Sequence, residues 1–160
     1  MKIRKAERKD LSDILRIYAY AREFMKEHGN PDQWEWFIFS GACPGGYGKG
    51  NLLCVHGRRT YCRCICVFKG EDPTYRIIRE GSWHRNSPYG VLHRVASDGS
   101  IKGIARFCFD FAKENCDYLR IDTHKDNIPM QNTLAKNGFC RCGIINTDDG
   151  SPRIAYDWEA

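Results

Sequence analysis

Apolar residues recur at spacings of three and four near the start of the chain, which is typical of an amphipathic helix. These positions are Leu11, Ile14, Leu15, Tyr18, Ala21 and Met25. Asp10 precedes them, where a helix N-cap belongs, and Gly29 follows them, where a helix ends. The pattern therefore predicts one helix between Asp10 and Gly29, preceded by a weakly alternating strand at residues 2–5.

The periodicity disappears between Asn30 and Asn51, and residues 41–50 are rich in glycine. Regular structure is disfavoured there, so this stretch predicts a long loop. Two apolar runs follow at residues 52–56 and 61–68, separated by a turn at residues 57–60. They predict a β-hairpin.

Strands and helices alternate in the second half of the chain. The patterns predict strands at residues 89–96, 118–123, 139–145 and 154–158, and helices at residues 101–115 and 128–137. A hairpin followed by such alternation favours an α/β fold with a mixed sheet over a sandwich or a helical bundle. Because 160 residues suit one compact core, we expect a single domain spanning residues 1–160.

The composition narrows the classes of function. The formal charge of +5 is spread along the chain, whereas nucleic-acid binders gather Lys and Arg on one surface, so no nucleic-acid partner is expected. The longest apolar runs are too short to span a membrane, and the basic start has no apolar stretch behind it. We therefore expect a cytoplasmic protein whose nine cysteines are reduced thiols.

One stretch, residues 95–105, could bind an anion, because a strand passes through a turn of small residues into a helix. Free N–H groups at a helix start suit a pyrophosphate, and Lys102 adds a positive charge. Gly103 and Ala105 would let a ligand approach the backbone closely. From these residues alone, an ordinary strand-to-helix turn is the alternative interpretation.

Two segments resemble the cofactor-binding segments of the GNAT acetyltransferase superfamily. Residues 100–105, Ser-Ile-Lys-Gly-Ile-Ala, are similar to its motif Gln/Arg-x-x-Gly-x-Gly/Ala at the two small positions, although Ser100 departs at the first position. Residues 126–130, Asp-Asn-Ile-Pro-Met, with the helix to Asn137 and then Gly-Phe, resemble the second segment. The two matches cover roughly residues 91–144 in the expected order. The residues around them resemble an uncharacterised bacterial subgroup of the superfamily.

The resemblance implies a GNAT-like acyl-CoA N-acyltransferase fold, a central mixed sheet flanked by helices, with its central strands splayed. It implies transfer of an acetyl group from acetyl-CoA to a primary amine by direct attack in a ternary complex. The N–H of Val95 would point at the thioester carbonyl, and Asn127 would contact the pantetheine arm. The residues that would hold the pyrophosphate are Ser97, Gly99, Ser100, Lys102, Gly103, Ile104 and Ala105.

Such a reaction needs a base, because the acceptor amine must be neutral to attack. His93 lies two positions before Val95 on the same predicted strand, so both would project to one face. Asp122 and His124 are also two positions apart, and a carboxylate beside an imidazole raises its basicity. A structural histidine, or a polar pair at a strand end, is the alternative for each candidate.

Two departures from the family pattern limit the resemblance. The position of the tyrosine that often protonates the leaving thiolate matches Leu134, so water or another group such as Tyr118 would do that work. Residues 36–50 stand where the family has a charged helix that shapes the acceptor site. The acceptor, an amine on a small molecule or a protein, is therefore not identified, and a homodimer stays open. A catalytically silent CoA-binding or regulatory domain is the alternative function.

Five cysteines occupy alternate positions on two predicted strands. Three lie on the first, Cys62, Cys64 and Cys66, and two lie on the second, Cys140 and Cys142. One intervening residue is poor spacing for zinc, which is usually bound by paired cysteines with two to four residues between them. We therefore interpret these residues as small buried apolar side chains and expect no metal.

Overall fold

The computed structural model describes residues 1–31, 52–56 and 62–160, with the backbone alone at residues 62–69. Its strands are β1 (Lys2–Lys5), β2 (Leu52–His56), β3 (Cys62–Lys69), β4 (Gly90–Ser97), β5 (Tyr118–Thr123), β6 (Cys140–Asn146) and β7 (Pro152–Glu159). Its helices are α1 (Leu11–Glu27), α2 (Ile104–Asn115) and α3 (Ile128–Lys136), with short 3-10 turns η1 (Arg8–Asp10) and η2 (Pro73–Tyr75). The predicted elements are therefore present, apart from the loop at residues 30–51 and the turn at residues 57–60, which lie largely or wholly outside the described residues.

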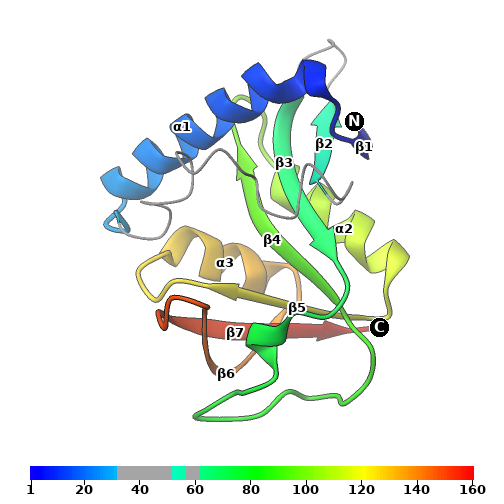
Figure 1. The fold of residues 1–160 in the computed structure, drawn as a ribbon, viewed down its shortest axis with the longest axis vertical. Helices are drawn as coiled ribbons and strands as arrows, with labels where there is room; N and C mark the ends of the chain where they lie inside the picture. The colour runs from blue at the N-terminus through cyan, green and yellow to red at the C-terminus, as the bar shows by residue number, and fades with distance from the viewer. Residues whose placement is uncertain (32–51, 57–61) are drawn as a thin grey trace. The chain divides into compact units, whose positions relative to one another are not determined.

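The described strands are hydrogen-bonded in the order β1-β2-β3-β4-β5-β7-β6 (Figure 1). β4 and β5 are parallel, and the pairs β1–β2, β2–β3, β5–β7 and β6–β7 are antiparallel, so the predicted mixed sheet is confirmed. By their contacts the residues form two compact units, residues 1–68 with 94–108 and residues 69–93 with 109–160. The single domain expected from the length stays a prediction. No helix in the described part of the chain combines the length and apolarity needed to cross a bilayer.

The first unit is built around the apolar stripe of α1. Ile14, Ile17 and Tyr18 are buried on this stripe, and they pack in one cluster with Leu52 and Cys54 of β2. Figure 1 shows α1 crossing β2 and β3, as an amphipathic helix does when it covers one face of a sheet. The predicted hairpin is present, because β2 and β3 pair in antiparallel register.

Asp10 occupies the N-cap position of α1 as predicted, but its side chain makes no capping bond to this helix. Its carboxylate instead accepts bonds of 2.7 Å from both terminal nitrogens of Arg4 and one of 2.7 Å from the N–H of Glu7. The carboxylate therefore ties the first strand to η1.

The helix predicted at residues 101–115 begins later, at Ile104. Gly103 has a φ of 82°, which is the left-handed region and does not fit a helix, so residues 100–103 form a bend followed by a turn. The first helical bond in this region runs from the N–H of Phe107 to the carbonyl of Gly103. The N–H groups of the first turn therefore precede the hydrogen-bond ladder.

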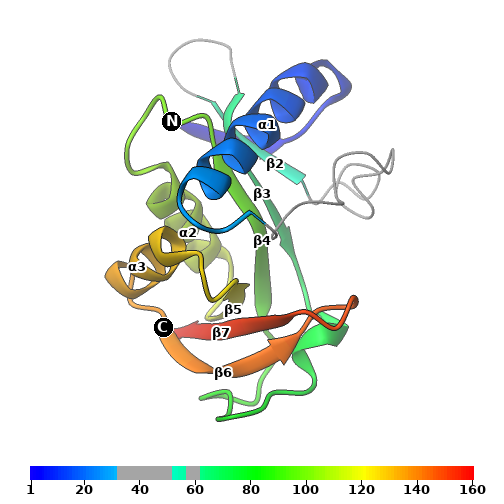
Figure 2. The same cartoon turned by 90° about the vertical axis from the view of Figure 1, so that its left-hand side faces the viewer.

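The second unit contains β5, β6, β7 and α3. Figure 2 shows α3 on one side of β5 and β7. The parallel pairing of β4 with β5 covers only Gly90 with Leu119 and Val91 with Arg120. The splayed central strands that the resemblance implies stay a prediction.

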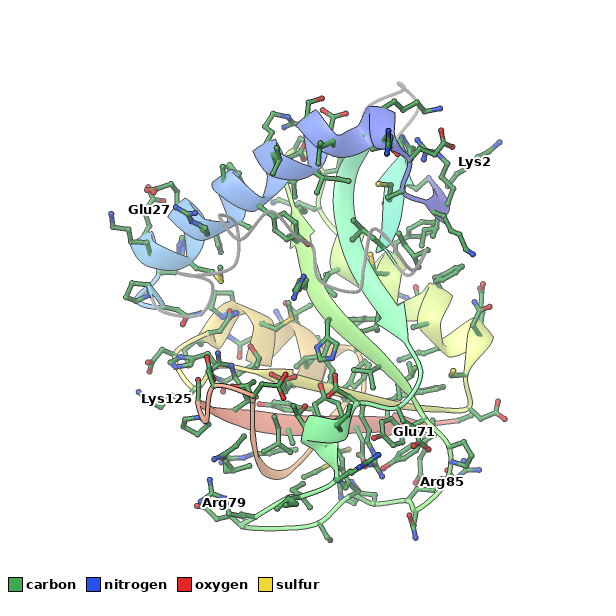
Figure 3. The ribbon with its side chains drawn as sticks, viewed as in Figure 1. Lys2, Glu27, Glu71, Arg79, Arg85 and Lys125 are labelled. Carbon is green, nitrogen blue, oxygen red and sulfur yellow. The ribbon has the colours of Figure 1, made fainter. Side chains whose placement is uncertain are left out.

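A segment that the sequence did not predict, residues 70–89, lies against β6 in the second unit. It runs from Glu71 past Arg79 to Arg85, which Figure 3 labels. Arg79 and Ile144 exchange backbone hydrogen bonds of 2.8 Å. A Cβ on Gly81 would lie 1.9 Å from the carbonyl oxygen of Cys142, so only glycine fits there.

The predicted burial is confirmed for Cys142 and is wrong for Cys140, which is exposed. The pairing of β6 with β7 shifts register between Arg141 and Gly143, and such a bulge breaks the simple alternation of faces. The side chains of the three cysteines in β3 lie outside the described residues.

Candidate active site

A cluster of polar side chains surrounds His93 in the second unit. Nε2 of His93 lies 2.8 Å from Oδ2 of Asp72, and Nδ1 lies 3.8 Å from Oδ1 of Asp122. The side chain of His93 is 25% exposed, whereas those of Asp72 and Asp122 are only 9% and 11% exposed. The imidazole is thus held between two carboxylates and still open to solvent.

Both carboxylates are fixed by their other contacts. The hydroxyl of Tyr75 donates a bond of 2.6 Å to Oδ1 of Asp122, and Nε of Arg153 lies 4.0 Å from Oδ2 of the same residue. Complete burial, followed by the charge of Asp122, raises the pKa of Tyr75 well above its usual value. The phenol therefore stays protonated and acts as a hydrogen-bond donor to Asp122.

The turn η2 positions Asp72. Asp72 is its N-cap, and Oδ1 accepts bonds of 2.9 Å from the N–H and 2.8 Å from the hydroxyl of Thr74. Oδ2 therefore remains for His93. The run Asp72-Pro73-Thr74 carries a recognisable signal, an N-cap followed by proline, that could have identified this turn from the sequence.

Of the predicted base residues, the structure brings His93 and Asp122 together. The predicted pair of Asp122 with His124 is not the contact that forms, because β5 ends at Thr123 and its alternation of faces does not reach His124. Nδ1 of His124 instead accepts a bond of 3.3 Å from the N–H of Asp126. Asp72 and Tyr75 are members of the cluster that no sequence pattern predicted.

The backbone of β4 is irregular between His93 and Val95. Arg94 has a φ of 55°, a left-handed conformation that is rare for a residue with a side chain. The regular alternation that would put His93 and Val95 on one face does not hold across such a residue. The prediction that their side chains share a face therefore loses its basis.

In the first unit, the turn at residues 97–103 holds most of the predicted pyrophosphate ligands. Oδ1 of Asp98 accepts bonds of 3.0 Å from the N–H and 2.5 Å from the hydroxyl of Ser100, and Oγ of Ser97 accepts one of 3.4 Å from the N–H of Gly99. Two of the N–H groups expected to face a phosphate are thus engaged within the turn.

Asp98 is ionised in this turn. Burial opposes ionisation, but the bonds from Ser100 and the neighbouring Arg16 hold the pKa of Asp98 below its usual value. The carboxylate shapes the turn and adds a negative charge to it.

The start of α2 fits a phosphate better. Space is open around Gly103, where a Cβ would meet nothing within 4 Å, and Lys102 and Arg106 are exposed on either side. The N–H groups of the first helical turn add the positive end of the helix dipole. The segment from Lys102 to Arg106 therefore offers the donors, the charge and the open backbone that a pyrophosphate needs.

Asn127, predicted to contact the pantetheine arm, is the N-cap of α3. Its Oδ1 accepts a bond of 3.2 Å from the N–H of Met130. Asn127 therefore caps the helix through the oxygen of its amide.

No protein-family model matches the chain, and none of the curated proteins matches it. Among solved structures, a GNAT-family acetyltransferase from Streptococcus agalactiae is 26% identical, with 99% of this chain and 95% of that chain covered and a TM-score of 0.87. This chain belongs to the GNAT superfamily.

Two less similar structures share the fold. An acetyltransferase from Staphylococcus aureus is 22% identical, with 99% of both chains covered and a TM-score of 0.66. The NatC complex bound to Gag peptide and CoA contains a chain that is 15% identical, with a TM-score of 0.54 and with 100% of this chain and 99% of that chain covered. The expected GNAT fold and the class of acetyl-CoA-dependent acetyltransferases are therefore confirmed.

The resemblance places Leu134 at the position of the usual GNAT tyrosine. Leu134 is fully buried in α3. Tyr118, suggested as a substitute acid, is 1% exposed and donates a bond of 2.7 Å to Oδ2 of Asp157. Burial raises the pKa of Tyr118 to about 12, so its hydroxyl is a structural donor to Asp157 and the structure gives the substitute no support.

A hollow of about 460 Å³ opens beside Tyr75 in the second unit of this GNAT protein. It is lined by Glu71, Tyr75, Arg76, Trp83, Asn86, Ser87, Pro88, Tyr89 and Arg120. The guanidinium of Arg120 lies 4.2 Å from the ring centre of Trp83 and 4.0 Å from that of Tyr89. These cation–π contacts stabilise the wall of the hollow.

Proposed function

We propose that the protein transfers the acetyl group of acetyl-CoA to a primary amine and that His93 accepts the proton which the amine loses. Membership of the GNAT superfamily supports the transfer. The observation that supports His93 is its position between Asp72 and Asp122, with a quarter of its side chain still exposed.

The contacts of His93 suit a proton acceptor. With Nε2–H donating to Asp72, Nδ1 carries the lone pair that takes the proton from the amine. The positive imidazolium that results lies beside two carboxylates, which stabilise it. Tyr75 keeps Asp122 oriented by donating to the oxygen nearer His93.

The cofactor residues keep their predicted roles in this proposal. Acetyl-CoA supplies an activated acetyl group as a thioester. The N–H of Val95 would bind the thioester carbonyl oxygen as negative charge develops on it. Lys102 and the backbone from Gly103 to Ala105 would bind the pyrophosphate, and Asn127 would contact the pantetheine arm.

The acceptor is a primary amine on a small molecule or on a protein, and the protein acts in the cytoplasm. A homodimer would not alter the proposed chemistry.

The proposal is tested by substituting His93→Gln and measuring release of free CoA from acetyl-CoA across a panel of amines, as a function of pH. Loss of a general base lowers kcat by a factor of about 100 or more, so we expect that fall in the variant. We also expect the rise in rate through the pH range where an imidazole loses its proton to disappear. His124→Gln is the matched control and keeps both the rate and the pH profile.

The outcomes separate the competing assignments. If His93→Gln keeps the wild-type profile and His124→Gln loses it, the base is His124 and our assignment is wrong. If the wild type binds CoA but turns over no amine in the panel, the alternative of a catalytically silent CoA-binding domain is favoured. Asp72→Asn should lower kcat less than His93→Gln does, because it removes only the group that positions the ring.

A further inference from the structure

Three side chains with metal-binding atoms converge in the second unit, and none of them belongs to the cluster around His93. Nδ1 of His84 lies 2.7 Å from Oδ1 of Asp157 and 3.4 Å from Sγ of Cys142. One ligand atom from each residue lies within 4.8 Å of the other two. His84 comes from the segment 70–89, Cys142 from β6 and Asp157 from β7, so the cluster joins three parts of the fold.

The geometry is close to that of a zinc site. Zinc bonds of about 2.0–2.3 Å in a tetrahedron place the ligand atoms roughly 3.3–3.6 Å apart. The distance from nitrogen to sulfur in the cluster already matches, and the distance from nitrogen to oxygen needs to open by about half an ångström. The three donor types, imidazole, thiolate and carboxylate, are those that zinc binds.

The surroundings hold the ligands in place. Oδ2 of Asp157 accepts bonds from the hydroxyl of Tyr118 at 2.7 Å and from the N–H of His84 at 2.9 Å, while Oδ1 lies beside Nδ1 of His84. Such outer contacts orient the ligands in known metal sites. The side chain of His84 is 50% exposed, which gives an ion a path from solvent.

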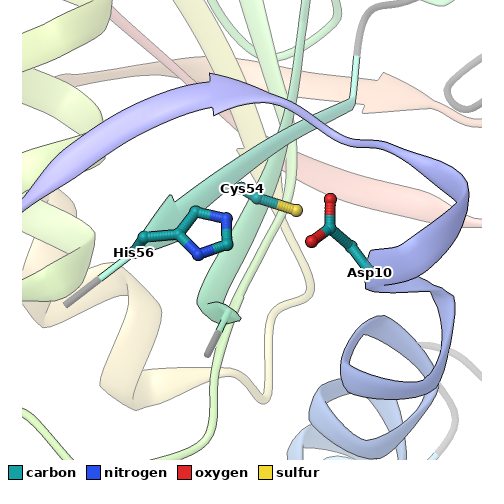
Figure 4. A group of neighbouring side chains, drawn as sticks. All are labelled: Asp10, Cys54 and His56. Carbon is teal, nitrogen blue, oxygen red and sulfur yellow. The ribbon is translucent and has the colours of Figure 1, made fainter. Parts of the chain in front are cut away.

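A second group of side chains with metal-binding atoms lies in the first unit, but its carboxylate is already paired with an arginine. Asp10, Cys54 and His56 point toward one another in the first unit (Figure 4). Both oxygens of Asp10 already accept bonds from the guanidinium of Arg4, so the charge of this carboxylate is already balanced by a cation. Asp157 forms no ion pair with a lysine or an arginine in the described part of the chain.

We propose that His84, Cys142 and Asp157 bind one divalent cation of the zinc type. Nδ1 of neutral His84, Sγ of Cys142 and Oδ1 of Asp157 are the ligands, and water fills the fourth position. The Cys142 thiol releases its proton to solvent as the metal–sulfur bond forms. The ion fastens the segment 70–89 to β6 and β7, and it takes no part in acetyl transfer.

The test uses the full-length protein, freed of metal with EDTA and then titrated with Co²⁺ as a spectroscopic probe. We expect one Co²⁺ per chain, the visible bands of a tetrahedral ion, and a near-ultraviolet band from sulfur to cobalt. Zn²⁺ should displace the cobalt and abolish these bands. His84→Ala, which alters a half-exposed side chain and so keeps the fold, should weaken Co²⁺ binding by at least tenfold.

Two cysteine variants assign the sulfur ligand. Cys142→Ser should lose the band from sulfur to cobalt, whereas Cys140→Ser, altered two residues away at an exposed position, should keep it. The proposal is wrong if the wild type retains no Co²⁺ or Zn²⁺, or if His84→Ala binds as tightly as the wild type. It is also wrong if the band survives Cys142→Ser but disappears in Cys54→Ser, because the ion would then occupy the group around Asp10.

Discussion

Gly103 combines two demands on a single residue. Its φ of 82° is unfavourable for any residue with a Cβ, and the space around it is open for a ligand. The variant Gly103→Ala should lose about 1 kcal/mol of stability from the backbone strain. Its added methyl should also weaken CoA binding by roughly tenfold, because it obstructs a charged hydrogen bond to phosphate. Urea unfolding and calorimetry of CoA binding measure the two effects.

Gly150 gives a matched control for this prediction. It has a φ of 80°, and a Cβ there would also meet nothing within 4 Å, but it lies between β6 and β7. Gly150→Ala should show the same loss of stability with unchanged CoA binding. Equal CoA affinities in the two variants would show that no phosphate approaches Gly103.

Of the residues around the candidate base, His93 and Asp122 were predicted from the sequence, whereas Asp72 and Tyr75 were not. His93 and Asp122 stood out because the resemblance located the two strands on which a base was expected. Asp72 and Tyr75 lie 21 and 47 residues away from their partners in the sequence. No local pattern links residues at such separations, so only the folded chain shows them as one cluster.

At the scale of an element, α3 depends on its N-cap. Asn127→Ala removes the bond from Oδ1 to the N–H of Met130 and should cost about 1 kcal/mol of stability. Asn127→Ser keeps an oxygen that can cap the helix but lacks the amide nitrogen. We expect Asn127→Ser to unfold at nearly the wild-type urea concentration and yet to bind CoA more weakly.

The pair of variants separates a structural role from a cofactor contact. If both bind CoA as the wild type does, Asn127 is only a helix cap and its proposed contact with the pantetheine arm is wrong. If Asn127→Ala alone binds more weakly, the loss follows from damage to α3.

The sequence patterns predicted the boundaries of some elements less well than their existence. The apolar spacing predicted a helix from residue 101, but backbone conformation at Gly103 delays its start to Ile104. The segment 70–89 has no hydrophobic periodicity that would predict its structure. Contacts with β6 and β7, rather than regular secondary structure, hold it in place. Long periodic elements such as α1 were predicted within a residue or two, since one buried face sets their pattern.

For the whole molecule, the order of elements together with two short motifs was sufficient to predict the GNAT fold. The grouping of contacts into two units could not be predicted, because the boundaries fall inside β3, β4 and α2, where the local pattern is continuous. Each unit also buries a charged carboxylate that the hydrophobic pattern does not explain, Asp10 in the first and Asp157 in the second. Because these two carboxylates are charged in the folded protein, its stability should depend on pH in acid.

Both carboxylates have pKa values below the usual one. Bonds from Arg4 are the main cause at Asp10, while at Asp157 burial opposes ionisation but bonds from Tyr118 and His84 prevail. A carboxylate whose pKa is lower in the folded state stabilises the fold above its unfolded pKa of about 3.9. That contribution is lost as the pH falls through the folded pKa, because the folded state must then take up a proton.

Acid unfolding followed by circular dichroism tests this account. In the wild type, the free energy of unfolding should fall steeply below about pH 4. Asp10→Asn and Asp157→Asn should each be less stable at pH 7 and lose stability less steeply in acid, since neither has that proton to bind. Glu7→Gln is the control: its side chain is 52% exposed, its ion pairs are screened by solvent, and the slope should hardly change. A wild-type slope retained in both aspartate variants would show that acid unfolds the protein through other groups.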